Sequence, residues 1–358
     1  MIAGVTAALL AVILVFSVPA AAISARSYVL LDAATGRILD ERLPDQKSLI
    51  ASTTKIMTAL VVCEQCNVLD RVRIPKEAVG IEGSSMYLQE GEILTVQELL
   101  YGMMLRSGND AATALAIYCG GTVEGFAQLM NDKARTLGLK NTHFENPHGL
   151  DGVQHFSTAE DLARLSAYAM NNPIFAKIVS TKTTRVGQRQ LTNHNKLLWQ
   201  VEGADGVKTG FTKAAGRILA SSAQRNGRRL VAVTIHAPDD WNDHAVLLNK
   251  GFSRYHPSQI VKRADVLGLA EIAGGQEKAV QLIAKDDFFY PLAKDENVEI
   301  FLPQPEFVYA PVVYGQDAGF AYLSVNGHSI GRVALIFGQT VEQEIVEKDS
   351  VWKRIFGG

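Results

Sequence analysis

The order of strand-like and helix-like segments constrains the fold of this 358-residue chain more than any other feature of its sequence. Two short apolar runs flank a turn that contains Gly36, at residues 27–31 and 38–42, and they predict a β-hairpin. Apolar residues at helical spacing follow, at 53–64, 96–105, 111–117 and 158–170. Strand-like runs return at 206–209, 217–223 and 229–236, the last two joined by Asn226-Gly227, and a helix is expected at 245–252. Strands at both ends with helices between them predict an α+β domain, with an antiparallel sheet covered by helices.

The predicted secondary structure changes after His256-Pro257, from mixed helices and strands to strands alone. Short β-type runs punctuated by Gly, Asp and Pro occupy residues 280–284, 298–302, 307–313, 320–325 and 329–337. About 85 residues of this kind suffice for a small β-sandwich. We therefore expect a first domain over residues 26–256 and a small all-β domain over 257–341.

The N-terminal residues 1–25 resemble a signal peptide. They contain no Lys, Arg, Asp or Glu, and an apolar run at 7–18 is followed by small residues at 20–22. This pattern predicts export. The positive charges expected near Met1 are missing, so a misassigned start and an uncleaved anchor both stay open as alternatives.

Residues 342–358 form a candidate amphipathic tail. One helical face would carry the apolar residues Val341, Ile345, Trp352, Ile355 and Phe356. Such a helix can lie on a membrane surface. A short packing terminus is the alternative, because anionic lipid would repel the acidic residues Glu342, Glu344, Glu347 and Asp349.

Charge and cysteine content narrow the function classes. The formal net charge is −2, without the clustered basic excess that nucleic-acid binding requires, so we expect no nucleic-acid partner. Three cysteines, Cys63, Cys66 and Cys119, cannot all pair within one chain, which excludes a disulfide scaffold. The C-x-x-C of Cys63 and Cys66 lies in a helix-like apolar stretch, which favours packing over redox or zinc chemistry. No second Cys or His pair and no H-E-x-x-H completes a metal site, so no metal or cofactor is expected.

Three short motifs carry the candidate chemistry, in the order Ser52-x-x-Lys55, Ser107-Gly108-Asn109 and Lys208-Thr209-Gly210. Residues three apart on a helix face the same side, so Lys55 can reach the Ser52 hydroxyl and take its proton. Ser107 and Asn109, on a loop between helices, could relay protons and bind a substrate amide. The Lys208 ammonium at a strand edge offers a fixed charge for a carboxylate, and that edge can accept an extended peptide.

Each motif alone is weak evidence. A second Ser-x-x-Lys occurs at Ser350 and Lys353, and a second Ser-x-Asn occurs at Ser324 and Asn326. The three motifs are strong evidence only together, because they occur in order at a helix start, on an interhelical loop and on a strand edge. Ser52 is a possible N-cap of the first helix.

Three stretches that contain these motifs resemble low-molecular-mass penicillin-binding proteins of the serine D-Ala-D-Ala carboxypeptidase family. They are STTKIMTAL (52–60), LRSGNDAA (105–112) and DGVKTGFT (205–212). Residues 146–150, 155–159 and 193–198 are also similar to family segments, and residues 258–341 resemble the family's C-terminal β domain. The resemblance covers almost the whole chain and implies the penicillin-binding, serine β-lactamase-like transpeptidase fold.

The resemblance also implies a mechanism and partners. Ser52 would attack the carbonyl between two D-alanines at the end of peptidoglycan stem peptides, with Lys55 as its base, and water would hydrolyse the acyl-enzyme. Ser107 and Asn109 would organise proton transfer. The substrate-binding residues would be Lys208, Thr209, Gly210 and Phe211, with the Ser52 and Phe211 N–H groups as the oxyanion hole. β-Lactams would be covalent inhibitors, and the protein would act at the outer face of the cytoplasmic membrane or in the cell wall. Some relatives carry His where Phe211 stands, so a side-chain role of that His is absent here.

The sequence leaves several other functions open. A serine β-lactamase needs a group that activates the deacylating water, and no convincing Glu is evident. A peptidoglycan DD-endopeptidase would use the same site with a longer leaving group, and a wall-binding scaffold would need no intact motifs. His148 and His194 suggest a Ser-His-Asp triad, but no G-x-S-x-G surrounds Ser52, so we expect structural hydrogen bonding for both.

Overall fold

The structure is a computed structural model that describes residues 22–303 and 307–345. Most of the expected signal peptide, most of the expected tail and the second Ser-x-x-Lys lie outside these residues. The first part of the chain forms an antiparallel sheet in the order β2-β1-β9-β8-β7. Its strands are β1 (Ser27–Asp32), β2 (Ile38–Arg42), β7 (Ala204–Thr212), β8 (Gly216–Arg225) and β9 (Arg228–Ile235). The expected α+β fold is confirmed, and β7 lies at a sheet edge.

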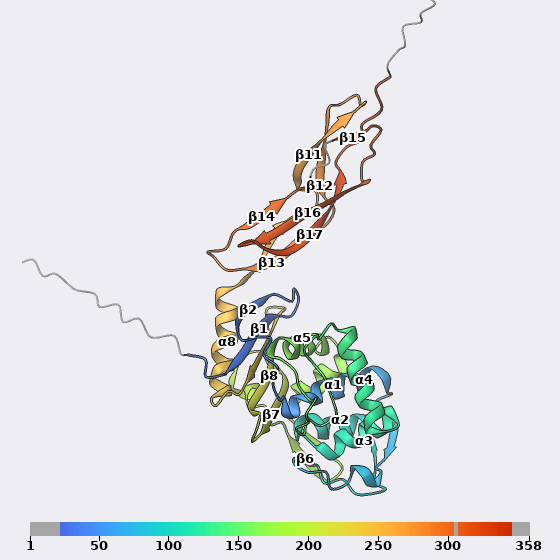
Figure 1. Ribbon diagram of the computed structural model, residues 1–358, viewed down its shortest axis with the longest axis vertical. Coiled ribbons are helices and arrows are strands. Elements are labelled where there is room, and N and C mark those ends of the chain that lie inside the picture. Colours follow the sequence, from blue (N-terminus) through green and yellow to red (C-terminus); the bar gives the residue numbers. More distant parts are fainter. Residues whose placement is uncertain (1–21, 304–306, 346–358) are drawn as a thin grey trace, which may run out of the picture.

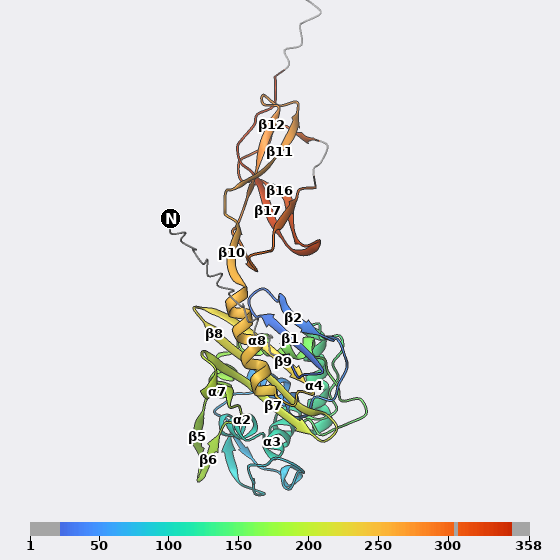
Figure 2. The ribbon, with the colours of Figure 1, turned by 90° about the vertical axis from the view of Figure 1, so that its left-hand side faces the viewer.

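Helices cover both faces of this sheet (Figures 1 and 2). Alternate residues of a strand point to opposite faces. Val29 and Leu31 of β1 share one core with Leu162 of α5 (Ala159–Ala169), whereas Leu30 packs in a second core with Leu247 of α8 (Asp240–Arg254). The sheet is therefore buried between α5 and α8.

The helices of the middle segment pack on the α5 side of the sheet. They are α1 (Lys55–Gln65), α2 (Val96–Leu105), α3 (Asn109–Gly120), α4 (Val123–Thr136) and α6 (Pro173–Ser180), whereas the short α7 (Leu197–Gln200) contacts β7. The sequence reading missed α4, α6 and α7, and two small hairpins. These hairpins pair β3 (Arg71–Arg73) with β4 (Ile93–Thr95) and β5 (Thr183–Val186) with β6 (Arg189–Thr192). A signal for α4 was present: Thr122 caps its N-terminus, and Phe126 and Met130 have the spacing of a buried face.

One local expectation was wrong. Ser52 does not cap a helix but lies inside a 3₁₀ turn, η1 (Ala51–Thr54), which leads directly into α1. Ala51 has a φ of 45°, in the left-handed region that side chains with a Cβ seldom adopt. The backbone just before Ser52 is therefore held in an unfavourable conformation by its surroundings.

The second part of the chain is all-β, as expected. Its strands are β10 (His256–Val261), β11 (Val266–Ala273), β12 (Ala279–Ala284), β13 (Phe288–Leu292), β14 (Val298–Phe301), β15 (Val308–Tyr309), β16 (Asp317–Val325) and β17 (His328–Phe337). Six of them form a sheet in the order β14-β16-β17-β12-β11-β15, and β10 pairs with β13. Strands β10, β11 and β13 were not expected from the sequence. In both views the β part extends from the end of α8, away from α2 and α3 (Figures 1 and 2).

Arg37 joins the two parts. Its guanidinium lies 5.1 Å from the ring centre of Tyr255 and 5.0 Å from that of Tyr290. It also donates to the Pro291 carbonyl and forms an ion pair with Glu296. Two aromatic rings, a backbone carbonyl and a carboxylate thus surround the Arg37 guanidinium at this junction. Within the described residues, no helix has the length and apolar character needed to cross a membrane.

Candidate active site

Ser52 and Lys55 meet at the junction of η1 and α1. The continuous helical backbone sets their spacing, and Lys55 Nζ lies 3.0 Å from Ser52 Oγ. The Lys55 side chain is fully buried, with an exposed fraction of 0%. Lys55 therefore reaches Ser52 as the motif predicted, and it does so in the protein interior, away from solvent.

Two oxygen atoms hold the Lys55 amine in place. Nζ donates to Asn109 Oδ1 at 2.7 Å and to the His148 carbonyl at 2.6 Å. A neutral amine has two N–H donors and one lone pair. Because the two donors are used by these acceptors, the lone pair is left for the third neighbour, Ser52 Oγ.

Burial and charge both favour the neutral form of Lys55. Burial holds its pKa well below the ordinary value of 10.5, and the neighbouring Lys208 ammonium lowers it further. The Asp110 carboxylate opposes this effect but is the smallest of the three influences. Within the described residues, no carboxylate forms an ion pair with Lys55.

The loop before α3 brings the second motif to the same place. Ser107 is buried and has a φ of 62°, a conformation that non-glycine residues rarely adopt. Asn109 begins α3, and its Nδ2 donates to the Glu82 carbonyl at 2.6 Å while Oδ1 receives Lys55. Glu82 belongs to a segment that the sequence analysis had left unassigned.

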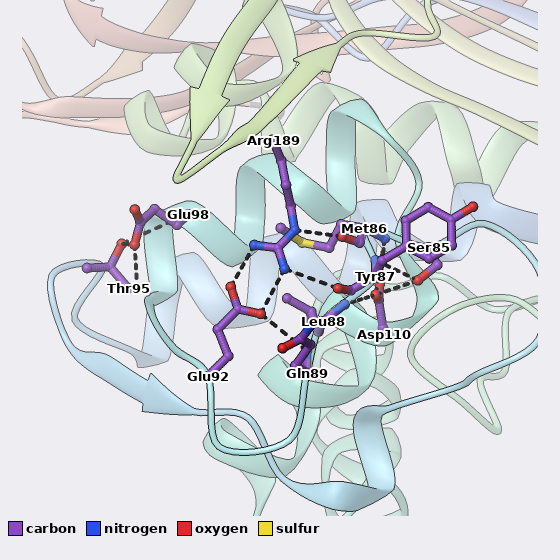
Figure 3. A network of polar contacts seen from close by, with 10 residues as sticks. All are labelled: Ser85, Met86, Tyr87, Leu88, Gln89, Glu92, Thr95, Glu98, Asp110 and Arg189. Carbon is purple, nitrogen blue, oxygen red and sulfur yellow. Dashed lines mark hydrogen bonds and ion pairs between the residues drawn. The ribbon is translucent and has the colours of Figure 1, made fainter.

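Asp110 of α3 and Arg189 of β6 both bind that segment (Figure 3). The buried Asp110 carboxylate accepts the backbone N–H of Met86 and the N–H of Leu88, each at 3.1 Å. From β6, Arg189 donates to the Met86 carbonyl at 2.8 Å and forms a two-point ion pair with Glu92. The loop beside the site is therefore fixed by a carboxylate on one side and a guanidinium on the other (Figure 3).

The third motif lies along the edge strand β7. Lys208 is 2% exposed and donates to the Thr209 carbonyl at 2.8 Å, while Phe211 is 64% exposed. Gly210 lies very close to η1: a Cβ at this position would be 3.2 Å from Thr53 N and 3.3 Å from Ser52 N. Only glycine lets the two backbones approach so closely without adjustment.

The sequence predicted a fixed positive charge at Lys208, but the burial of this side chain disfavours its charged form. Burial lowers the pKa of Lys208 to about 7. Its ammonium is therefore about half deprotonated at neutral pH unless an anion lies beside it.

A cleft of about 280 Å³ connects these groups. The three motifs contribute Ser52, Ser107, Thr209 and Gly210 to its walls, and Phe211 and His194 also line it. The remaining lining residues were not selected from the sequence: Ser84, Arg217, Asp240 and Trp241. Arg217 donates to Asp240 at 2.7 Å, and its guanidinium carbon lies 5.7 Å from the Trp241 ring centre. In the second Ser-x-Asn, by contrast, Ser324 is in β16 and Asn326 is in the turn that follows it, and neither residue lines the cleft.

Comparison with known proteins identifies the family of this chain. A family model described as D-alanyl-D-alanine carboxypeptidase matches residues 14–239, and one described as penicillin-binding protein 5, C-terminal domain, matches residues 255–343. The chain belongs to the D-alanyl-D-alanine carboxypeptidase family.

Relatives of this family match over most of the chain. The D-alanyl-D-alanine carboxypeptidase DacC of Escherichia coli is 34% identical over 91% of this chain and 86% of its own length. DacF of Bacillus subtilis is 32% identical over 86% of this chain and 83% of its own length. A crystal structure of penicillin binding protein 5 from Haemophilus influenzae covers 90% of this chain and 98% of its own, with a TM-score of 0.75 and 31% identity.

The histidines of this family member have different surroundings. His148 Nδ1 accepts the Leu150 N–H at 3.2 Å, which agrees with the expected structural role. His194 instead lines the cleft, and no side-chain hydrogen bond to it is found among the described residues. Burial lowers the pKa of His148 to about 3 and that of His194 to about 4, with further lowering by nearby lysines. Both imidazoles are neutral at physiological pH.

The sequence placed His155 in a stretch similar to the family, residues 155–159, but assigned it no role. The Glu145 N–H donates to its Nδ1 at 3.1 Å, so the proton is on Nε2, which lies 2.7 Å from Thr54 Oγ1. Thr54 in turn donates to the Ala51 carbonyl at 2.8 Å. This chain of hydrogen bonds holds the strained turn that carries the candidate nucleophile.

Proposed function

We propose that this chain is a serine DD-carboxypeptidase that removes the terminal D-alanine from peptidoglycan stem pentapeptides through an acyl-enzyme on Ser52. The observation that carries the proposal is the state of Lys55. It is a buried amine with a lowered pKa, both of its N–H groups are occupied, and its lone pair is free for Ser52 Oγ at 3.0 Å.

Acylation follows from this arrangement. Lys55 takes the hydroxyl proton as Ser52 Oγ attacks the carbonyl carbon between the two D-alanines. The developing oxyanion accepts hydrogen bonds from the backbone N–H groups of Ser52 and Phe211, on two segments that Gly210 allows to lie close together. The proton passes through the Ser107 hydroxyl to the leaving amine, and water then hydrolyses the ester.

Substrate binding uses the edge strand. The peptide pairs with β7, Asn109 holds its amide, and Lys208 and Thr209 receive the terminal carboxylate. Arrival of the carboxylate stabilises the charged form of Lys208, whose pKa in the free site is about 7. Phe211 contributes only its backbone N–H, because its phenyl ring has no hydrogen-bond donor.

β-Lactams acylate the same serine, and the fate of that adduct distinguishes a carboxypeptidase from a β-lactamase. Among the described residues that line the cleft, the carboxylate of Asp240 is engaged by Arg217. A free carboxylate for rapid deacylation is not found there, which favours a long-lived adduct. Mass spectrometry of products from pentapeptide and from crosslinked muropeptides separates carboxypeptidase from DD-endopeptidase activity.

The test of the proposal is Ser52→Ala. This variant should lose both D-alanine release and covalent labelling by penicillin, because no acyl-enzyme can form. Ser350→Ala, which alters the second copy of the motif, is the matched control and should keep both activities. Penicillin labelling that persists in Ser52→Ala, with the adduct mapped to another residue, would show that Ser52 is not the nucleophile.

We further propose an exported protein with a signal peptide at 1–25, a catalytic domain at 26–256, a β domain at 257–341 and a membrane-surface tail at 342–358. The end of α8 at Arg254 and the start of β10 at His256 support the central boundary. Liposome flotation of the signal-free protein, with and without residues 342–358, tests the tail. Equal flotation of the two forms would remove the tail from the proposal.

A further inference from the structure

The first described residues are part of the folded domain. Ile23 packs against the core that lies between the sheet and α8, and Ala25 is 1% exposed. Ala22, by contrast, is exposed. The folded domain therefore begins at Ile23, before residue 26, where the sequence analysis expected it to start.

A buried carboxylate of α8 binds this N-terminal segment. Asp243 is 1% exposed, and its carboxylate accepts the Ser24 N–H at 2.8 Å, the Ser24 hydroxyl at 2.7 Å and the Ala25 N–H at 3.1 Å. Within residues 22–303 and 307–345, no ion pair with Asp243 is found. Without these three donors, the buried charge would lose the groups that compensate for its loss of water.

Further contacts connect the segment to the wall of the cleft. The Ser24 hydroxyl accepts the Asp239 N–H at 3.1 Å, directly before the start of α8. Asp240 and Trp241, the first two residues of α8, line the cleft. Residues 23–25 thus hold the end of α8 that contributes to the candidate active site.

We propose that a signal peptidase cuts the Ala22–Ile23 bond, so that the mature chain starts at Ile23. This inference rests on the proposed export and moves the end of the signal peptide from residue 25 to residue 22. Signal peptidases prefer small residues at the first and third positions before the cut. Ala22 and Ala20 meet this preference, whereas a cut after Ala25 would place Ile23 at the third position.

The structure distinguishes this cut from its neighbours. A cut after Ser24 also has small residues at both positions, Ser24 and Ala22. It would remove Ser24, which supplies two of the three donors to Asp243. A cut after Ala25 would remove all three donors. Of these three cuts, the one after Ala22 alone keeps every contact of the segment.

The reaction is a peptide-bond hydrolysis that consumes one water. It leaves a carboxylate on Ala22 and a free amine on Ile23, and this amine is largely protonated at neutral pH. The new ammonium is one residue before the Ser24 N–H that binds Asp243. A positive charge is therefore created on the side of the segment where a buried negative charge already lies, which favours the docked segment.

The experiment produces the full chain with its own leader in a bacterium and identifies the N-terminus of the exported protein by intact mass and N-terminal sequencing. We expect Ile23. Any other N-terminus, or a protein that stays uncut, would overturn the proposal. Ala22→Trp should accumulate as the uncut precursor, whereas the matched control Ala21→Trp should be processed like the parent, because the middle position tolerates any side chain. Processing of Ala22→Trp at the parent rate would contradict the assigned bond.

A second variant tests the structural reason for this site. In the processed protein, Ser24→Ala should lower the thermal midpoint by roughly 3 °C or more, because two hydrogen bonds of the hydroxyl are lost. Ser253→Ala, on an exposed part of the same helix, should change the midpoint little. A Ser24→Ala protein that melts with the parent would refute the role of the segment. These readouts do not depend on catalytic activity, so their failure is distinguishable from a failure of the Ser52 test.

Discussion

Replacing Lys208 by methionine should make the protein more stable at neutral pH, although it removes a residue of the proposed site. Lys208 is buried, and no carboxylate lies within ion-pair distance among the described residues. Its pKa falls from 10.5 to about 7 on folding. The unfolded chain therefore binds the proton more tightly than the folded one, and protonation favours unfolding.

The sign and size of the effect follow from these two values. The penalty is absent above pH 10.5, grows as the pH falls and is complete below the folded pKa of about 7. One pKa unit corresponds to about 1.4 kcal/mol, so the penalty is about 4 kcal/mol at pH 7 and about 2 kcal/mol at pH 9. Methionine has a similar length and fills the same space, but it leaves the Thr209 carbonyl without its donor, which costs about 1 kcal/mol. A net gain of about 3 kcal/mol at pH 7 remains.

Calorimetric or circular-dichroism melting at both pH values measures this gain. The thermal midpoint of Lys208→Met should exceed that of the parent by roughly 5–10 °C at pH 7 and by less at pH 9. Lys213→Met, which alters an exposed lysine on the turn after the same strand, should change the midpoint little at either pH. A Lys208→Met protein that melts below the parent at pH 7, or whose gain does not shrink at pH 9, would refute the reasoning.

Three more predictions concern catalysis. The kcat/KM for D-alanine release should rise with pH as Lys55 loses its proton and fall above about pH 7 as free Lys208 loses its charge, and a profile flat from pH 6 to 9 would contradict this. Gly210→Ala should slow acylation by a chromogenic β-lactam about 10²-fold with little change in melting, because its Cβ would displace oxyanion-hole donors. An unchanged acylation rate would exclude that role. His155→Leu should lower kcat at least about tenfold and leave KM nearly unchanged, whereas His155→Gln, which can still donate to Thr54, should retain more activity. An equal loss of kcat in both variants would argue that this hydrogen bond does not position the turn.

The sequence determined those features of the fold that depend on local periodicity. The hairpin β1–β2, helix α2 and strands β7 to β9 were predicted because their apolar residues alternate or recur at helical spacing over short stretches. The meeting of Ser52 and Lys55 was predictable for the same reason, since three helical positions fix their separation. Helix α4 was overlooked although its cap and spacing were visible in the sequence.

Only the tertiary structure decided what surrounds these groups. The acceptors of the Lys55 amine come from positions 54 and 93 residues away, and burial rather than residue type lowers the pKa of Lys208. The same holds for the position of His194 in the cleft. Backbone periodicity fixes contacts between residues a few positions apart, whereas contacts across the chain, and the loss of water that shifts a pKa, arise only when distant segments pack together.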